Sequence, residues 1–162
     1  MVNRLVVDES DSHRRQNSSR GNRLPALSYV ATSEPVYVWL RLEPGTDPIQ
    51  GIAGLVEQLG ADSGSIVQCM GSLSRATFVI AIPDESGGWR FSEPIVKLGP
   101  MEFLSAQGTW GREAETGRLI VHLHGFVVDS EGKAHGGHFI PGGSRIMATC
   151  EVGLLTGDGL TI

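Results

Sequence analysis

The sequence LIVHLHGFVVDSEGKAHGGHFI, residues 119–140, contains the pattern on which most of the chain is built. Apolar residues alternate with other types over 119–128, which is typical of a β-strand with one buried face. The polar run Asp-Ser-Glu-Gly at 129–132 predicts a tight turn, and a second strand is predicted at 138–140. A strand, a turn and a returning strand indicate antiparallel pairing.

The same pattern extends along the chain in both directions. A second hairpin loop is predicted at 84–88, where the sequence reads Asp-Glu-Ser-Gly-Gly. Further strands are predicted at 36–42, 66–70, 77–82, 89–91, 95–98, 101–107 and 145–155.

One segment follows helical spacing instead. Asp47 is the predicted N-cap, Pro48 the first helical residue and Gly60 the C-cap. Gly51 and Gly54 lie inside this helix and weaken it by roughly 1 kcal/mol each, so packing must stabilise it. Its apolar face is formed by Ile49, Ile52, Ala53, Val56 and Leu59. One principal helix among many hairpin-linked strands predicts an α+β fold with a mainly antiparallel sheet.

Composition limits the possible classes of protein. The 162 residues suit one domain, and the 40% apolar content is enough to bury a core. Glycine contributes 22 residues, about twice its usual share, which indicates tight turns and argues against a helix bundle or coiled coil. No apolar run reaches the roughly 18 residues of a membrane span, so no membrane partner is expected.

Charge and cysteine content favour a cytoplasmic protein that does not bind DNA through its body. Residues 1–25 form a polar arm that we expect to be flexible, followed by a single domain at 26–162. That domain holds 8 basic and 15 acidic side chains, a net charge of −7, which repels a polyanion. Two cysteines, Cys69 and Cys150, and the lack of an apolar secretory segment at 1–30 favour the cytoplasm.

Four of the five histidines fall within 17 residues: His122, His124, His135 and His138. In a strand, His122 and His124 share one face, with their Cα atoms roughly 7 Å apart. The returning strand can place His138 beside them. Three neutral imidazoles with an open position are typical of a catalytic zinc site, although iron, nickel, cobalt and copper also accept such ligands. The alternative is that these are ordinary hydrogen-bonded strand residues. His135, near the turn, is expected to lie just outside the metal's ligands or in solvent.

Three other polar features are candidates. Glu102, within Gly-Pro-Met-Glu-Phe-Leu-Ser at 99–105, is either a fourth metal ligand, a general base, or a strand glutamate that faces water. The segment 71–75, Gly-Ser-Leu-Ser-Arg, is either an anion-binding turn or a plain strand-ending turn. Arg145 and Glu151 share one strand face, and Arg145 could contact a bound ligand. Four further side chains are predicted to pack in the core or at a subunit contact: Trp39, Trp89, Trp110 and Cys150.

The order of these motifs resembles that of the plants-and-prokaryotes-conserved (PPC) domain, bacterial branch. The resemblance runs from Val36 to Leu155, about three quarters of the chain. It is carried by the segments 41–47 (RLEPGTD), 71–74 (GSLS), 99–105 (GPMEFLS), 122–124 (HLH), 129–132 (DSEG), 136–138 (GGH) and 148–151 (ATCE).

The resemblance implies an antiparallel sheet with short flanking helices, assembled as a homotrimer. It also implies a metal site at His122, His124 and His138, with Glu102 close by. The fold is similar to that of acetolactate decarboxylase, a metal enzyme that uses three histidines, but a shared fold does not establish a shared function.

The resemblance leaves three hypotheses for function. The first is a zinc-binding trimer that performs metal-dependent chemistry on a small oxygen-rich molecule. The second is a DNA-binding regulator, because plant relatives join this domain to an AT-hook; here Arg20-Gly-Asn-Arg23 does not match the Arg-Gly-Arg-Pro centre of an AT-hook. The third is a ligand-sensing or scaffold trimer in which the metal is structural or vestigial.

Overall fold

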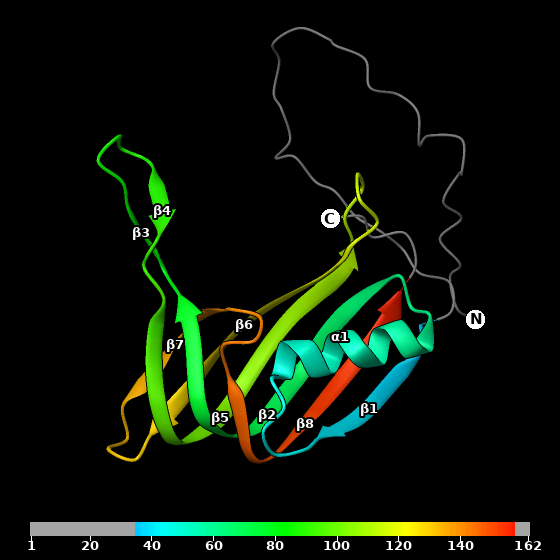
Figure 1. The fold of residues 1–162 in the computed structure, drawn as a ribbon, viewed down its shortest axis with the longest axis horizontal. Coiled ribbons are helices and arrows are strands. Elements are labelled where there is room, and N and C mark those ends of the chain that lie inside the picture. Colours follow the sequence, from blue (N-terminus) through cyan, green and yellow to red (C-terminus); the bar gives the residue numbers. More distant parts are fainter. Residues whose placement is uncertain (1–34, 158–162) are drawn as a thin grey trace, which may run out of the picture.

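Eight strands and one helix make up residues 35–157, the part of the chain that the computed structural model describes (Figure 1). The predicted arm at 1–25 lies outside the described residues. The elements in chain order are β1 Tyr37–Leu42, α1 Pro48–Leu59, β2 Ser63–Val79, β3 Ala81–Pro83, β4 Trp89–Phe91, β5 Ile95–Arg112, β6 Leu119–Asp129, β7 Ala134–Phe139 and β8 Arg145–Gly157. These elements confirm the predicted α+β class with a mainly antiparallel sheet.

Two expectations about helices can be compared with these elements. The short flanking helices implied by the resemblance do not occur between 35 and 157, where turns and short loops connect the strands. Among the same residues, no helix is both long enough and apolar enough to cross a membrane.

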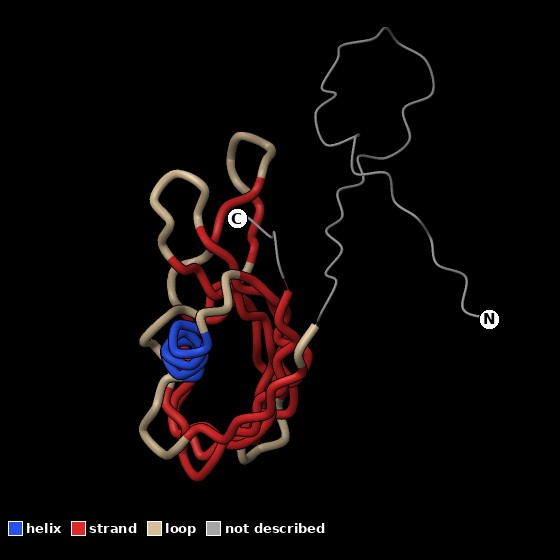
Figure 2. The backbone as a smooth tube through the Cα atoms, turned by 90° about the vertical axis from the view of Figure 1, so that its right-hand side faces the viewer, coloured by secondary structure: helices blue, strands red, loops and turns tan. Residues whose placement is uncertain are grey.

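The six long strands form one antiparallel sheet in the order β1-β8-β2-β5-β6-β7. The end of β2 also pairs with β7, through Phe78 with Phe139 and Val79 with His138. This additional pairing brings β7 back to the middle of the sheet, so the strands curve into a ring. An end-on view shows the ring, with α1 covering one of its sides (Figure 2).

The helix begins and ends where the sequence predicts. Asp47 has an extended backbone, and its side chain accepts a hydrogen bond from the backbone N–H of Gln50 at 3.1 Å. The same carboxylate accepts from the backbone N–H of Ser144 at 2.9 Å, which joins the start of α1 to the loop before β8. Gly60 closes the helix in the left-handed conformation, with φ of 63°. The cap residues therefore fix the helix relative to the sheet.

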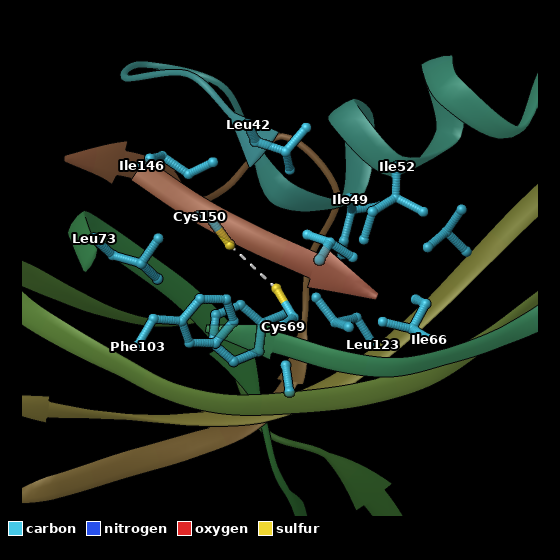
Figure 3. Close-up of a cluster of buried hydrophobic side chains, with 14 of the residues drawn as sticks. Leu42, Ile49, Ile52, Ile66, Cys69, Leu73, Phe103, Leu123, Ile146 and Cys150 are labelled. Atoms are coloured by element: carbon cyan, nitrogen blue, oxygen red, sulfur yellow. Dashed lines mark hydrogen bonds between the residues drawn. The ribbon is translucent and has the colours of Figure 1, made fainter. Parts of the chain in front are cut away.

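The core lies between α1 and the inner face of the sheet (Figure 3). Trp110, Cys69 and Cys150 are fully buried there, as predicted for Trp110 and Cys150. The two free thiols lie with their Sγ atoms 3.3 Å apart. Their hydrogen bond and their burial raise the pKa of Cys69 well above its ordinary value. In contrast, Trp39 and Trp89 are 53% and 65% exposed.

The prediction of a turn at 71–75 is wrong in both of its forms, because β2 runs through this segment with only an irregularity in register. A Cβ atom on Gly71 would overlap the carbonyl oxygen of Thr149 on the neighbouring strand. The Ser72 hydroxyl accepts a hydrogen bond from the backbone N–H of Ala148 at 3.2 Å. The glycine and serine therefore serve close strand packing, not a turn or an anion site.

Just as β2 runs from the strand predicted at 66–70 into that predicted at 77–82, one long strand replaces another predicted pair. The segments expected at 95–98 and 101–107 join into β5, which runs through Gly99 and Pro100. A Cβ atom on Gly99 would overlap the carbonyl oxygen of Leu73 on β2. As at Gly71, a residue type typical of turns is present here because two backbones approach closely.

Candidate metal centre

The outer face of the sheet, opposite α1, carries His122 and His124 on β6 and His138 on β7. The burial of β6 alternates, with Val121 and Leu123 buried and the two histidines exposed between them. His138 is directly paired with His124 in the β6–β7 register. The hairpin therefore brings the three histidines together, as the sequence predicts.

The three rings are in mutual contact. The ring centroids of His122 and His124 lie 4.8 Å apart with nearly parallel planes. His138 is nearly perpendicular to both, at 4.6 Å from His122 and 5.0 Å from His124. One candidate ligand nitrogen from each ring lies within 4.8 Å of the other two. This arrangement leaves one side of the cluster open to solvent.

The spacing of two of the nitrogen atoms fits a tetrahedral zinc ion. Two ligands at 2.0–2.1 Å from a tetrahedral zinc are about 3.3 Å apart. Nδ1 of His138 lies 3.2 Å from Nε2 of His124, a distance at which the two nitrogens can also share a hydrogen bond. The candidate donor nitrogen of the third ring, His122, lies within 4.8 Å of both. The chemistry and the spacing of these donors therefore fit a single ion.

The environment favours neutral rings at two of the three positions. Partial burial lowers the pKa of His124, and the nearby His122 lowers it further. Burial and then the other two histidines lower the pKa of His138. A neutral imidazole keeps the lone pair that a metal needs.

Glycines let the strands around the histidines approach closely. A Cβ atom on Gly108 of β5 would overlap the carbonyl oxygen of His122. On β7, a Cβ atom on Gly136 would overlap the carbonyl oxygen of Gly125, and one on Gly137 that of Val79. The Gly-Gly pair before His138 therefore lets β7 pack closely against β6 and the end of β2.

Several neighbours of the histidines were not predicted from the sequence. Gln107 and Thr109 of β5 pair with His124 and His122 and share their face of the sheet. A shallow groove of about 300 Å³ opens beside His124, and its lining includes Gln107. On the other side, the ring of Phe91 in β4 lies 5.5 Å from the ring of His138. The alternation of Gln107, Gly108 and Thr109 is visible in the sequence, but the register that places them is not.

Within one chain, the structure does not bring Glu102 to the three histidines. Glu102 is exposed on the same outer face, but it pairs with Val128, four residues along β6 from His124. Four residues of strand span about 13 Å. Within one chain, Glu102 is therefore too far along the sheet to join the three histidines.

The structure also places His135 and Arg145 away from the cluster. His135 pairs with Val127, so it lies on the face of the sheet opposite to His138, and its Nε2 is 2.7 Å from Oδ2 of Asp129. The Arg145 guanidinium donates to the backbone carbonyls of Gly142 and Ser144, at 3.0 and 2.6 Å.

Comparisons with known proteins point to one family. Residues 31–157 match the sequence profile of the Plants and Prokaryotes Conserved (PCC) domain. The Bifunctional protein GlmU of Synechococcus sp. (strain JA-2-3B'a(2-13)) is 35% identical over 113 residues, which are 70% of this chain and 16% of that protein. The chain therefore spans only a small part of the curated relatives that it matches.

Several solved structures share the fold. A plant- and prokaryote-conserved (PPC) protein from Pyrococcus horikoshii aligns with a TM-score of 0.68 and 20% identity, over 84% of this chain and 88% of that one. A metal-containing protein from Archaeoglobus fulgidus aligns with a TM-score of 0.64 and 21% identity, over 81% and 84%. A Ralstonia eutropha JMP134 protein, described provisionally as DNA-binding, aligns with a TM-score of 0.60 and 22% identity, over 74% and 77%. At these identities the likeness concerns the fold alone.

Proposed function

Because this chain belongs to the Plants and Prokaryotes Conserved (PCC) domain family and brings three histidines to one point, we propose that it binds one zinc ion per chain. The ligands are His122, His124 and His138. The observation that carries the proposal is the convergence of three imidazoles whose ring nitrogens lie within 4.8 Å of one another. The metal-containing relative from Archaeoglobus fulgidus, which shares the fold, supports it.

Three protein ligands leave a coordination position for a small oxygen-rich molecule or for water. A zinc ion bound in this way supplies Lewis acidity or activates water. Gln107 and Thr109, beside the histidines, offer an amide and a hydroxyl that can hold such a molecule by hydrogen bonds. If the metal has a sensing or structural role instead of a catalytic one, the protein will contain the metal but will turn over no substrate.

The first test is the metal content of protein that is purified without a histidine tag. We expect about one zinc ion per chain by inductively coupled plasma mass spectrometry, and none in the His122→Ala/His124→Ala variant. His135→Ala is the matched control, because this histidine faces the other side of the sheet. Wild-type protein that contains no metal and takes up no added Zn²⁺ would refute the proposal. Loss of metal in a control that stays folded would refute the ligand assignment.

We further propose that the chain assembles as a homotrimer in the cytoplasm. The outer face of the sheet supports assembly, because it exposes six large apolar side chains, Tyr37, Trp39, Met70, Leu104, Phe126 and Met147. Patches of this kind in soluble proteins are usually covered by a partner. The two free thiols fit a reducing compartment.

A second candidate function is DNA binding, which the provisional description of the Ralstonia relative favours. The phosphate contacts would come from Arg14, Arg15, Arg20 and Arg23, which lie outside the described residues. This function predicts binding that weakens steeply with salt and disappears when residues 1–25 are removed. Fluorescence anisotropy with labelled duplex DNA measures both effects, and no binding at low salt would reject it.

A further inference from the structure

Two aromatic side chains, Trp89 and Phe91, belong to β4 and lie beside His138. The β3–β4 hairpin that carries them projects from the body of the fold (Figure 1). The ring of Phe91 lies 5.5 Å from that of His138, and Trp89 packs edge-on against Phe91 at 5.4 Å. Phe91 is 48% exposed and Trp89 is 65% exposed. An uncovered aromatic pair beside polar imidazoles offers an apolar surface that a bound ligand can cover.

The base of the hairpin ties Phe91 to the histidines. Val79, the last residue of β2, pairs with His138. The next residue, Ile80, donates its backbone N–H to the Ser92 hydroxyl at 3.2 Å and accepts from the Ser92 backbone N–H at 2.9 Å. The hairpin therefore leaves the sheet one residue after the partner of His138 and closes one residue after Phe91. Its base holds the Phe91 ring at the edge of the cluster.

The opposite side of the cluster offers two polar side chains. Gln107 and Thr109 on β5 pair with His124 and His122, and the groove beside His124 lies on this side. The histidine cluster thus has an amide and a hydroxyl on one side, where Phe126 lines the groove, and the Phe91 ring on the other. A ligand that satisfies both sides must itself have a polar and an apolar part.

We propose that the ligand of this site joins an oxygen-donor head group, of the carboxylate or hydroxamate class, to a flat apolar group that lies against Phe91. The inference rests on the proposed function, because the head group takes the open position of the metal. Phe91 is then the specificity-determining residue. Contact between two aromatic rings strengthens binding by up to about tenfold.

Two hydroxamates test this assignment on the zinc-loaded full-length chain. Acetohydroxamate and benzohydroxamate carry the same zinc-binding group and differ in a methyl against a phenyl substituent. By isothermal titration calorimetry, we expect benzohydroxamate to bind wild-type protein about tenfold more tightly. In Phe91→Ala, this preference falls to about twofold or less, while zinc content and acetohydroxamate affinity stay unchanged.

Phe126→Ala is the matched comparison, because it removes the competing phenylalanine. Phe126 is also a half-exposed phenylalanine, at 45%, and it lines the groove beside His124, so it is the competing apolar surface on the other side of the cluster. Unlike Phe91, it makes no ring contact with the three histidines among the described residues. We expect this variant to keep the preference for benzohydroxamate. A preference that disappears in Phe126→Ala and persists in Phe91→Ala would overturn the assignment.

The other outcomes separate this inference from the proposed function. A chain without zinc overturns both. A zinc-bound chain that binds the two hydroxamates equally overturns only the role of Phe91. A Phe91→Ala variant with unchanged preference but a lower assembled mass would also overturn it, because Phe91 would then contact a second copy of the chain.

Discussion

Asp129 closes the hairpin that carries the site. Its Oδ1 accepts hydrogen bonds from the backbone N–H groups of Glu131 and Lys133, at 3.0 and 2.9 Å, and its Oδ2 lies 2.7 Å from Nε2 of His135. The contact with His135 is the largest cause that lowers the pKa of Asp129 to about 2, from an ordinary value of 3.8, and the backbone hydrogen bonds add to it. The folded chain therefore favours the ionised carboxylate.

We expect Asp129→Asn to be less stable than wild type near neutral pH, and the difference to shrink in acid. Because folding lowers the pKa of Asp129, its contribution to stability is full above its unfolded pKa of about 4 and is lost as pH falls towards 2. Urea unfolding at several pH values between about 5 and 2 measures the difference. Glu131→Gln is the control, since Glu131 is an exposed carboxylate that pairs with Lys133. A difference independent of pH would contradict the prediction.

At the scale of the element, the two glycines inside α1 look alike in the sequence and differ in the fold. A Cβ atom on Gly51 would lie 2.7 Å from Cδ2 of Leu42, whereas one on Gly54 would meet no atom within 4 Å. Gly51 therefore leaves room for the Leu42 side chain of β1. Gly54 only weakens the helix.

We expect Gly54→Ala to stabilise the protein by about 1 kcal/mol, because alanine has the higher helix propensity. Gly51→Ala is the matched control: its methyl group must displace Leu42, so we expect no gain or a loss of about 1–3 kcal/mol. Urea denaturation of both variants measures the two effects. Equal stabilisation by both substitutions would contradict this prediction, because it would show that the Leu42 side chain moves aside with no loss of stability.

The elements that the sequence predicts well are those with local causes. The caps of α1 are fixed by Asp47 and Gly60, and the β6–β7 turn by Asp129, so neighbouring residues suffice to place them. Gly71 and Gly99 mislead because their causes are not local. Each glycine is required by a backbone on another strand, Thr149 and Leu73 respectively, and the sequence does not reveal that contact.

In the candidate site, too, some features have local causes and others depend on contacts between distant strands. Strand periodicity places His122 and His124 on one face, and the short hairpin brings His138 back beside them. Phe91 reaches the site because β2 pairs with β7, a contact between strands distant in sequence. Glu102 lies too far along β5 because of the register between β5 and β6. The local sequence pattern therefore predicts the three candidate metal ligands. The residues around them depend on which strands pair and in which register, and the sequence does not show this.

For the whole molecule, the two faces of the sheet differ. The inner face packs against α1, while the outer face carries the histidines and the exposed apolar side chains of five strands. Trp39 of β1 stands on this outer face, near Tyr37, at a ring distance of 6.4 Å. Leaving this surface in water is unfavourable by roughly 25 cal/mol for each Å². Association of copies through this face would remove that cost and bring the open side of the histidine cluster close to a neighbouring subunit.

We therefore expect wild-type protein to have about three times the 17.3 kDa mass of one chain in analytical ultracentrifugation. Trp39→Glu should lower the mass, because it places a charge on the contact face. Trp89→Glu makes the same chemical change at a tryptophan of similar exposure on the projecting hairpin, and it should leave the mass unchanged. A wild-type mass of one chain would contradict assembly. Loss of mass in Trp89→Glu alone would move the contact from the sheet to the hairpin, and the rings beside His138 would then be covered by protein instead of ligand.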